Sequence, residues 1–155
     1  MKTEPTLRPA ASADVAAITR IVRDAYSVYL PRMGKPPAPM LADYAATVTA
    51  KQATVLDAGG TVAGVIVLVE EPDHLLIENI AIDPRFQHRG LGRMLVEFAE
   101  QKARTRGYGE VRLYTNVLMT ENVEFYGRLG FAETHRATED GYARVFMRKR
   151  ISSRP

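Results

Sequence analysis

The sequence contains no cysteine and no tryptophan among its 155 residues. Without cysteine, the chain can form neither disulfides nor thiolate metal sites, and it has no thiol nucleophile. No apolar run reaches the roughly 20 residues that a membrane-spanning helix needs. The segment 1–9 also lacks the apolar core of a signal peptide. We therefore expect a cytoplasmic protein that uses no metal and no membrane.

The excess of positive over negative charge is also small: the sequence has 21 lysines and arginines and 18 aspartates and glutamates, for a net charge of +3. The one small basic cluster, Arg148-Lys149-Arg150, is interpreted as a solvated terminus and not as a nucleic-acid patch. Hydrophobic residues make up 46% and charged residues 25%, which is typical of a globular chain. The length predicts a single domain over residues 1–155.

Periodicity and turn residues predict the order β-α-α-β-β-β-α-β-α-β-β. Ser12 is expected to cap the first helix, which should end before the loop Pro31–Pro39. The other elements are expected as helices at 41–50, 91–106 and 121–129 and strands at 7–10, 54–57, 62–69, 75–82, 111–115, 131–134 and 143–148. This order predicts an α+β or mixed α/β layer fold, with one sheet and helices on both faces.

One segment leaves a strand and opens a helix through two glycines: Gln87-His88-Arg89-Gly90-Leu91-Gly92. The first turn of a helix presents unpaired N–H groups and the positive end of the helix dipole, which together bind anions. Glycine lets a phosphate approach the main chain closely. Arginines at 85, 89 and 93 add positive charge nearby. The segment is consistent with a pyrophosphate site or with a plain glycine-tolerant helix start.

Two familiar phosphate motifs do not fit this turn. Leu95 occupies the position of the third glycine in the dinucleotide fingerprint, and the turn follows a late strand instead of the first. No Gly-Lys-Ser/Thr follows, which excludes a P-loop.

Three segments resemble the GNAT N-acetyltransferase superfamily, in the family order. Glu78–Pro84 is similar to the family's central splayed strand, Gln87–Gly92 matches its Q/R-x-x-G-x-G/A turn, and Asn122–Phe131 matches its later helix and Leu-Gly-Phe. The resemblance covers roughly residues 75–131. It implies a GNAT-like acyl-CoA N-acyltransferase fold with a central, mostly antiparallel twisted sheet.

The resemblance implies acetyl-CoA as co-substrate. Its pyrophosphate would lie on the main chain of Gln87, His88, Arg89, Gly90, Leu91, Gly92 and Arg93. Its pantetheine arm would run beside Ile80, Ala81 and Ile82 and pair with the main chain of Ile80 and Ile82, as an added strand does. Asn116 is a further cofactor or water contact, and Asn122 either contacts the cofactor or caps its helix.

By match to the family, Tyr126 is the general acid for the CoA sulfur, because a phenol is neutral at pH 7 and has a proton to give. The alternative is a core tyrosine beside Phe125. A backbone N–H of the strand Ile80–Ile82 would stabilise the oxyanion. These roles describe direct attack by an amine, without a covalent enzyme intermediate.

Glu78 is the candidate general base, since burial in an apolar strand would make its carboxylate a better proton acceptor. The alternatives are an outward-facing strand residue, a structural partner for an arginine, or a base supplied by water. His74 is a weaker candidate and fits a turn residue better.

The acceptor pocket is expected along the first helix, the loop after it and the last hairpin. Its candidate residues are Tyr26, Tyr29, Arg32 and Met33, which suit a small molecule, amino acid or peptide with an apolar body and a carboxylate. A surface loop held by tyrosine packing fits the same residues. Transfer of another acyl group, a hydroxyl acceptor and a non-catalytic CoA-binding sensor remain alternative functions. A homodimer is compatible with the fold, but the sequence offers no interface signal.

Overall fold

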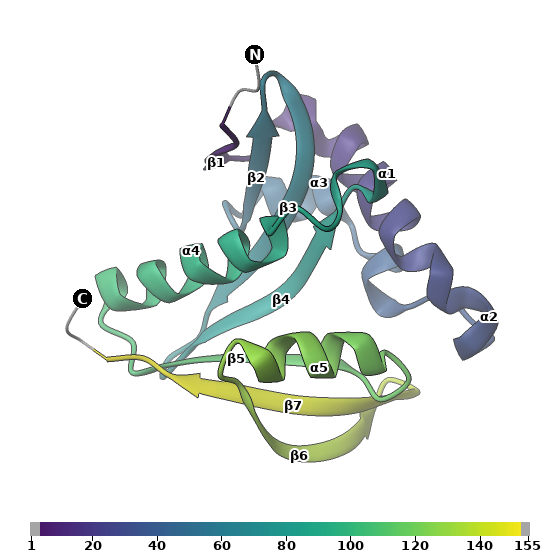
Figure 1. Cartoon of the computed structure of the whole chain (residues 1–155), viewed down its shortest axis with the longest axis vertical. Helices are drawn as coiled ribbons and strands as arrows, with labels where there is room; N and C mark the ends of the chain where they lie inside the picture. The colour runs from purple at the N-terminus through teal and green to yellow at the C-terminus, as the bar shows by residue number, and fades with distance from the viewer. Residues whose placement is uncertain (1–3, 153–155) are drawn as a thin grey trace. The chain divides into compact units, whose positions relative to one another are not determined.

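The computed structural model describes residues 4–152, and its seven strands form one sheet in the order β1-β2-β3-β4-β5-β7-β6 (Figure 1). The strands are β1 Thr6–Pro9, β2 Ala53–Ala58, β3 Thr61–Glu70, β4 Leu75–Ile82, β5 Glu110–Asn116, β6 Ala132–Glu139 and β7 Tyr142–Arg150. The α-helices are α1 Val15–Tyr26, α2 Leu30–Met33, α3 Tyr44–Thr49, α4 Leu91–Arg106 and α5 Thr120–Arg128. Four 3-10 turns complete the order: η1 Ser12–Asp14, η2 Ser27–Tyr29, η3 Ala38–Leu41 and η4 Pro84–Phe86.

The sheet is mostly antiparallel, as predicted. β1 with β2, β2 with β3, β5 with β7 and β6 with β7 pair in antiparallel fashion, whereas β4 and β5 are parallel. The parallel ladder covers Leu75 to Ile77 on β4 and Val111 to Leu113 on β5. The prediction of a mixed α/β layer fold is therefore confirmed.

The chain divides into two compact units, and β3, β4 and α4 each contribute to both. Unit 1 comprises residues Met1–Leu68 and Asn79–Leu95, and unit 2 comprises Val69–Glu78 and Val96–Pro155. We describe each unit by itself. The expectation of one domain over the whole chain stays a prediction.

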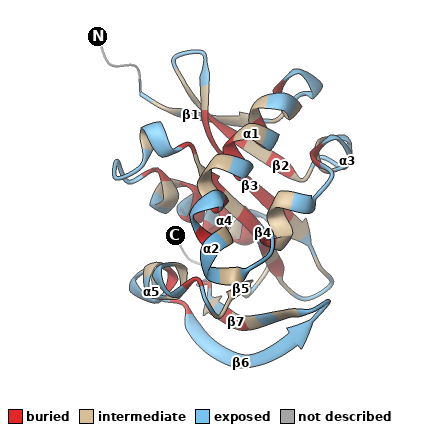
Figure 2. Ribbon diagram, turned by 90° about the vertical axis from the view of Figure 1, so that its right-hand side faces the viewer, coloured by how far each residue is buried: buried red, intermediate tan, exposed pale blue. Residues whose placement is uncertain are grey.

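The core of unit 1 comes from the predicted apolar stripe of α1 and from the strands β2 and β3. Ile18, Ile21 and Val22 recur at helical spacing on α1 and are at most 1% exposed. On β2 and β3 the side chains of Val55, Leu56, Val65 and Ile66 are fully buried. Figure 2 shows buried stretches of these two strands in red. Burial of this apolar surface is the main stabilising term of the unit.

Three expectations about the first helices of unit 1 are wrong. Ser12 is the first residue of η1 and not a cap; instead the carboxylate of Asp14 accepts a hydrogen bond of 2.7 Å from the main chain of Ala11. Pro31 does not start a loop, because it lies in the first turn of α2, where a missing N–H costs nothing. The next helix begins at Tyr44 and not at 41, since Asp43 accepts from the N–H of Ala46 as its N-cap.

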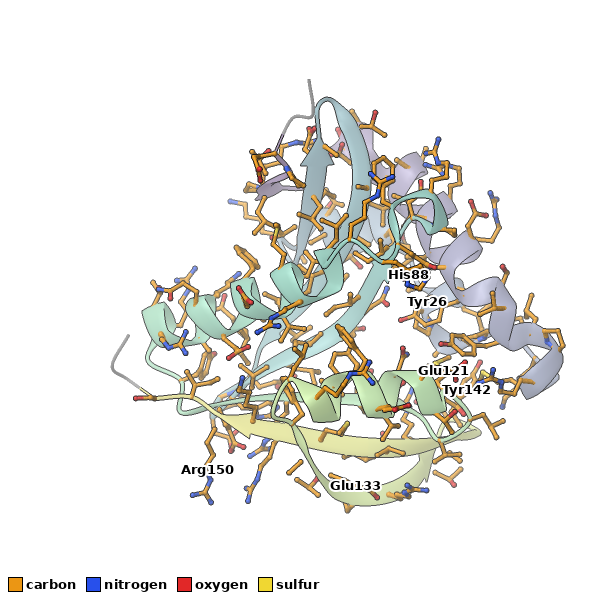
Figure 3. The ribbon with its side chains drawn as sticks, in the orientation of Figure 1. Tyr26, His88, Glu121, Glu133, Tyr142 and Arg150 are labelled. Carbon is orange, nitrogen blue, oxygen red and sulfur yellow. The ribbon has the colours of Figure 1, made fainter. Side chains whose placement is uncertain are left out.

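The sheet of unit 2 has two different faces. On the helix-covered face, Val111, Leu113, Val145 and Met147 are buried, and an ion pair of 2.8 Å joins Lys149 of β7 to Glu100 of α4. The opposite face, here called the open face, carries Arg112 and Tyr114 of β5 and Phe146 and Arg148 of β7, none of which is buried. Figure 3 shows Arg150 pointing from β7 away from α4 and α5, on the same side. All eight residues of β6 are exposed (Figure 2).

No helix among residues 4–152 is long and apolar enough to cross a membrane. Within the same range, no group of three or more histidine, aspartate or glutamate side chains is arranged to hold a metal ion.

Gly64 lets β3 and β4 approach each other within unit 1. A Cβ at this position would lie 2.8 Å from Cδ1 of Ile82 and 3.1 Å from the carbonyl oxygen of Ala81. Gly64→Val should therefore overpack the strand and lower the free energy of unfolding by roughly 1–3 kcal/mol, measured by urea denaturation. Gly109→Ala is the control, because its added Cβ meets no atom within 4 Å. Equal losses in both variants would contradict this account of the close approach.

Candidate functional site

The predicted strand-to-helix turn is present in unit 1 and has an uncommon backbone. After β4, Asp83 starts η4, Gln87 is extended, and α4 begins at Leu91. His88 has φ +65° and Gly90 has φ +76°, both in the left-handed region. A Cβ on Gly90 would meet nothing within 4 Å, so glycine is required there by backbone conformation and not by lack of space.

The first turn of α4 has N–H groups without a hydrogen-bond partner in the described part of the chain. The first helical hydrogen bond of α4 runs from the N–H of Met94 to the carbonyl of Gly90, at 3.1 Å. Among residues 4–152 the N–H groups of Leu91 and Gly92, in the first turn of α4, have no acceptor. Residues 87–90 are exposed. Free donors, positive backbone polarity and open space together fit a phosphate group.

A buried carboxylate holds the start of this turn, and the sequence reasoning missed it. Asp83 is 1% exposed, and its carboxylate accepts hydrogen bonds from the Arg85 side chain at 2.8 Å, from the Arg85 main chain at 2.9 Å and from Arg20 of α1 at 3.3 Å. The Arg85 hydrogen bonds hold the pKa of Asp83 at about 2, against the cost of burial. Arg85 is thus paired with Asp83, which balances part of the positive charge expected near the turn.

The end of β4 is tied to α1 and to the proline-rich segment by a buried network. The Tyr26 hydroxyl donates to Oδ1 of Asn79 at 2.7 Å and lies 3.1 Å from the carbonyl oxygen of Ile80. Nδ2 of Asn79 donates to the Tyr44 hydroxyl at 2.9 Å, and that hydroxyl donates to the carbonyl of Pro39 at 2.6 Å. The network fixes the main chain beside Ile80, one of the residues predicted to contact the cofactor.

The four residues expected to bind the acceptor lie around the end of α1 and in η2 and α2. Tyr26, labelled in Figure 3, and Tyr29 are each only 8% exposed, and their rings are 6.2 Å apart. Arg32 is exposed, with its guanidinium 5.2 Å from the centre of the Tyr29 ring, and Met33 is partly exposed. This is the tyrosine packing that the sequence allowed as an alternative. A role in acceptor binding stays a prediction.

Unit 2 holds Tyr126 on α5 in an aromatic cluster. Tyr126 is 7% exposed, and its ring centre lies 5.1 Å from that of Phe125 and 5.8 Å from that of Phe131. Such edge-to-face contacts hold a ring firmly. This agrees with the packing expected beside Phe125, and the catalytic role stays a prediction.

The two asparagines of unit 2 make local contacts. Asn116, at the end of β5, accepts a hydrogen bond of 2.9 Å from the N–H of Leu118. Asn122 does not cap α5, whose N-cap is Met119; its amide instead lies 3.4 Å from the hydroxyl of Thr115. Asn122 thus ties α5 to β5. Contact of either side chain with a cofactor stays a prediction.

Glu78 is exposed, so the burial that favoured it as a general base is absent. It occupies the outward strand position that was the alternative expectation. Nδ1 of His74 donates to the carboxylate of Asp73 at 2.7 Å in the turn before β4, as a turn residue does. The structure adds Tyr114, which the sequence reasoning missed: burial raises the pKa of Tyr114, Arg144 lowers it, and the Glu78 carboxylate adds to the rise. The sequence signal that could have placed Tyr114 on the face opposite the buried Leu113 is the alternation of side chains along β5.

The predicted site residues thus fall into two groups. Unit 1 brings together the glycine turn, the end of β4 and the tyrosines of α1 and η2. Unit 2 brings Glu78 close to Tyr114, and it also contains Asn116, Asn122 and Tyr126.

A family model described as "Acetyltransferase (GNAT) family" matches residues 16–131. Two curated proteins are similar over shorter stretches. The mycothiol acetyltransferase of Nocardia farcinica is 42% identical over 66 residues, which are 43% of this chain and 22% of that protein. The ribosomal protein bS18-alanine N-acetyltransferase of Salmonella typhimurium is 41% identical over 61 residues, or 39% of this chain and 41% of that protein. The matches therefore span less than half the length of these relatives.

Solved structures share the fold over almost the whole chain. The PaiA N-acetyltransferase of Thermoplasma acidophilum, solved with coenzyme A, superposes with a TM-score of 0.80 at 17% identity, covering 96% of this chain and 99% of that one. The ribosomal-protein-S18-alanine N-acetyltransferase of Escherichia coli gives 0.75 at 24% identity, covering 96% and 95%. At these identities the likeness establishes the fold alone.

Asp83→Asn should destabilise the protein in a pH-dependent manner. Because the pKa is lowered from 3.8 to about 2 in the folded state, the stabilisation is complete above pH ~5 and is lost as the pH falls toward 2. We expect the variant to lose about 2 kcal/mol of unfolding free energy at pH 7. Urea unfolding at a series of pH values should show the difference from wild type shrinking below pH ~4.

Asp24→Asn is the matched control, since Asp24 shares Arg20 at 3.5 Å but its side chain is 40% exposed. Its loss should stay below about 1 kcal/mol. Equal losses for Asp83 and Asp24, or an Asp83 difference that does not depend on pH, would show that the buried carboxylate does not hold the turn.

Proposed function

Because the chain belongs to the acetyltransferase (GNAT) family, we propose that it transfers an acetyl group from acetyl-CoA to a primary amine. Family membership indicates acyltransferase chemistry as the class of reaction. The observation that carries the proposal is the turn Gln87–Gly92, where the N–H groups of Leu91 and Gly92 have no acceptor among the described residues and Gly90 is left-handed with open space on its Cβ side. The proposed amine attacks directly in a ternary complex, and without cysteine the chain can form no thiol acyl intermediate.

Acetyl-CoA, when bound, supplies an activated thioester acyl group. The residues that would hold it are Ile80, Ala81 and Ile82, the turn from Gln87 to Arg93, and Asn116 and Asn122 of unit 2. The parallel ladder of β4 with β5 ends at Ile77, so it does not use the main-chain groups of Ile80 and Ile82. Free strand groups can pair with the amides of a pantetheine arm. We assign no metal to the reaction.

Tyr126 is the proposed general acid. Its phenol is neutral at pH 7 and can donate its proton to the departing thiolate. The contacts with Phe125 and Phe131 hold the ring in one orientation, which a proton donor needs. A main-chain N–H of Ile80–Ile82 would donate to the oxyanion.

The amine must lose a proton before or during attack. Glu78 is exposed, so it would accept this proton directly or through water. Tyr114 lies near it in the same unit: burial raises the pKa of Tyr114, Arg144 lowers it, and the Glu78 carboxylate adds to the rise.

The acceptor class is proposed from the chemistry of the reaction and from what two relatives are named for. One relative is named for mycothiol and another for the alanine of a ribosomal protein, so both small molecules and protein ends occur as acceptors among similar proteins. For this chain we propose a small molecule, an amino acid or a peptide, with Tyr26, Tyr29, Arg32 and Met33 contributing to its binding. A cytoplasmic location fits this reaction. A hydroxyl acceptor, another acyl-CoA or a non-catalytic CoA-binding module are the alternatives, and a homodimer is compatible with each.

Thiol release from acetyl-CoA over a panel of amines tests the proposal. The panel contains ethylamine, 2-phenylethylamine, glucosamine, cysteamine S-methyl ether and peptides that begin with alanine. Amine-dependent release of CoA, with the acetylated amine seen by mass spectrometry, is the expected result. Binding of CoA without release for any amine would favour the non-catalytic alternative.

Tyr126→Phe should lower kcat by roughly 100-fold, because a general acid contributes about that much or more. Binding of CoA, measured by calorimetry, should stay nearly unchanged. Tyr108→Phe is the control, since the Tyr108 hydroxyl donates to the carbonyl of Glu71 at 2.7 Å and has no proposed chemical role. An unchanged kcat in Tyr126→Phe would remove Tyr126 from the mechanism.

A further inference from the structure

The open face of unit 2 encloses one side of a cavity of about 510 Å³. Its lining comes from β4, β5, β6 and β7 and from the turn before β4, all within unit 2. The apolar and aromatic residues of the lining include Leu76, Tyr114, His135 and Phe146, and two buried residues of the helix-covered face, Leu113 and Met147, also border it. A volume of this size accommodates the body of a small organic molecule, since ligand pockets commonly measure about 300–1,000 Å³.

The aromatic side chains of the cavity form one continuous wall. The ring of His135 stacks on that of Phe146, with centres 4.4 Å apart and planes 5° from parallel. Phe146 contacts Tyr114 at 5.8 Å, and the Arg144 guanidinium covers the Tyr114 ring at 4.4 Å. Each ring is thus held by a neighbour, so the wall needs little reorganisation to receive a flat apolar group.

The charged residues around the cavity are balanced. Arg112 is paired with Glu110 at 2.8 Å and with Asp73 at 3.6 Å, and Arg144 is paired with Glu139 at 2.9 Å. Two arginines, at 112 and 148, and two glutamates, at 71 and 139, line the cavity. The lining therefore has no net charge that would select an anionic or a cationic body, and its selectivity must come from the aromatic wall.

The cavity adjoins the candidate reaction residues of the same unit. Tyr114 lines the cavity, and the charge of the Glu78 carboxylate contributes to the raised pKa of the Tyr114 hydroxyl. Leu76 and Glu78 are two residues apart on β4 and therefore share a face, with their side chains roughly 7 Å apart along the strand. An amine held at Glu78 would place the rest of its molecule over Leu76 and Phe146.

We propose that this cavity is an acceptor subsite for an aromatic group, so that the favoured acceptor is a primary amine with an aromatic ring a few bonds from its nitrogen. The proposal rests on the acetyl transfer proposed above and specifies its substrate. A free arylalkylamine and a peptide with an aromatic second residue carry the same chemistry.

The test compares amines with and without an aromatic group, using the full chain. Values of kcat/KM are measured for 2-phenylethylamine against ethylamine and for Ala-Phe-Gly against Ala-Gly-Gly. We expect the aromatic member of at least one pair to be favoured by roughly 10-fold or more, because burial of a phenyl ring is worth that factor. Preference within the first pair identifies a small amine, and preference within the second identifies a peptide.

Phe146→Ala should abolish this preference by lowering kcat/KM for the aromatic acceptor by roughly 10- to 100-fold, with ethylamine changed less than about 2-fold. Leu76→Trp, which fills the cavity without leaving a void, should have the same effect and guards against a folding defect. Arg150→Ala, on the same face but outside the lining, is the control. Binding of CoA should be unchanged in all three variants.

Direct calorimetric titration of 2-phenylethylamine and of Ala-Phe-Gly gives a readout that needs no turnover. Saturable binding of either that Phe146→Ala weakens supports the subsite. Turnover of ethylamine without any aromatic preference, or equal losses for all acceptors in Phe146→Ala, overturns the subsite and leaves the acetyl transfer intact. Absence of turnover with every amine overturns the proposed function. If, in addition, neither 2-phenylethylamine nor Ala-Phe-Gly binds saturably, the subsite is overturned as well.

Discussion

The buried carboxylate of Asp83 is the interaction on which the candidate cofactor site depends. It ends β4 and starts η4, and it accepts from the main chain and the side chain of Arg85 and from Arg20 of α1. A carboxylate that is only 1% exposed is costly unless its charge is matched, and here two arginines match it. The direction in which the chain leaves β4 is therefore fixed. His88 and Gly90 can then hold their left-handed conformations and lead into the first turn of α4, where the N–H groups of Leu91 and Gly92 have no acceptor among the described residues.

Features that depend on neighbouring residues could be predicted from the sequence. The apolar stripe of α1, the strand-to-helix change at Gly90 and the hairpin of β6 and β7 follow from spacing and turn residues, and all three are present. Boundaries were less accurate where local rules compete. Pro31 was expected to end helical structure, but it fits the first turn of α2, and β6 and β7 run longer than the apolar pattern suggested because exposed, polar β6 pairs through its main chain.

Features that depend on distant pairing could not be predicted. The network from Tyr26 through Asn79 to Tyr44 joins residues 53 and 35 positions apart, and no local pattern indicates it. The aromatic wall of the cavity needs the registers of β5 with β7 and of β7 with β6. Glu78 shows the opposite error: it was expected to be buried because its neighbours are apolar. Strand alternation instead turns it outward between the buried positions Ile77 and Asn79.

The central claim is that the turn Gln87–Gly92 binds a pyrophosphate. Gly90→Val tests it most directly, since a β-branched residue at φ +76° is strained and would rearrange the turn. Calorimetry of the wild type and the variant with CoA and with pantetheine, which lacks the pyrophosphate, separates the two parts of the cofactor. The account predicts that Gly90→Val weakens CoA binding by at least about 10-fold and leaves pantetheine binding unchanged. CoA binding as tight in the variant as in the wild type would contradict it.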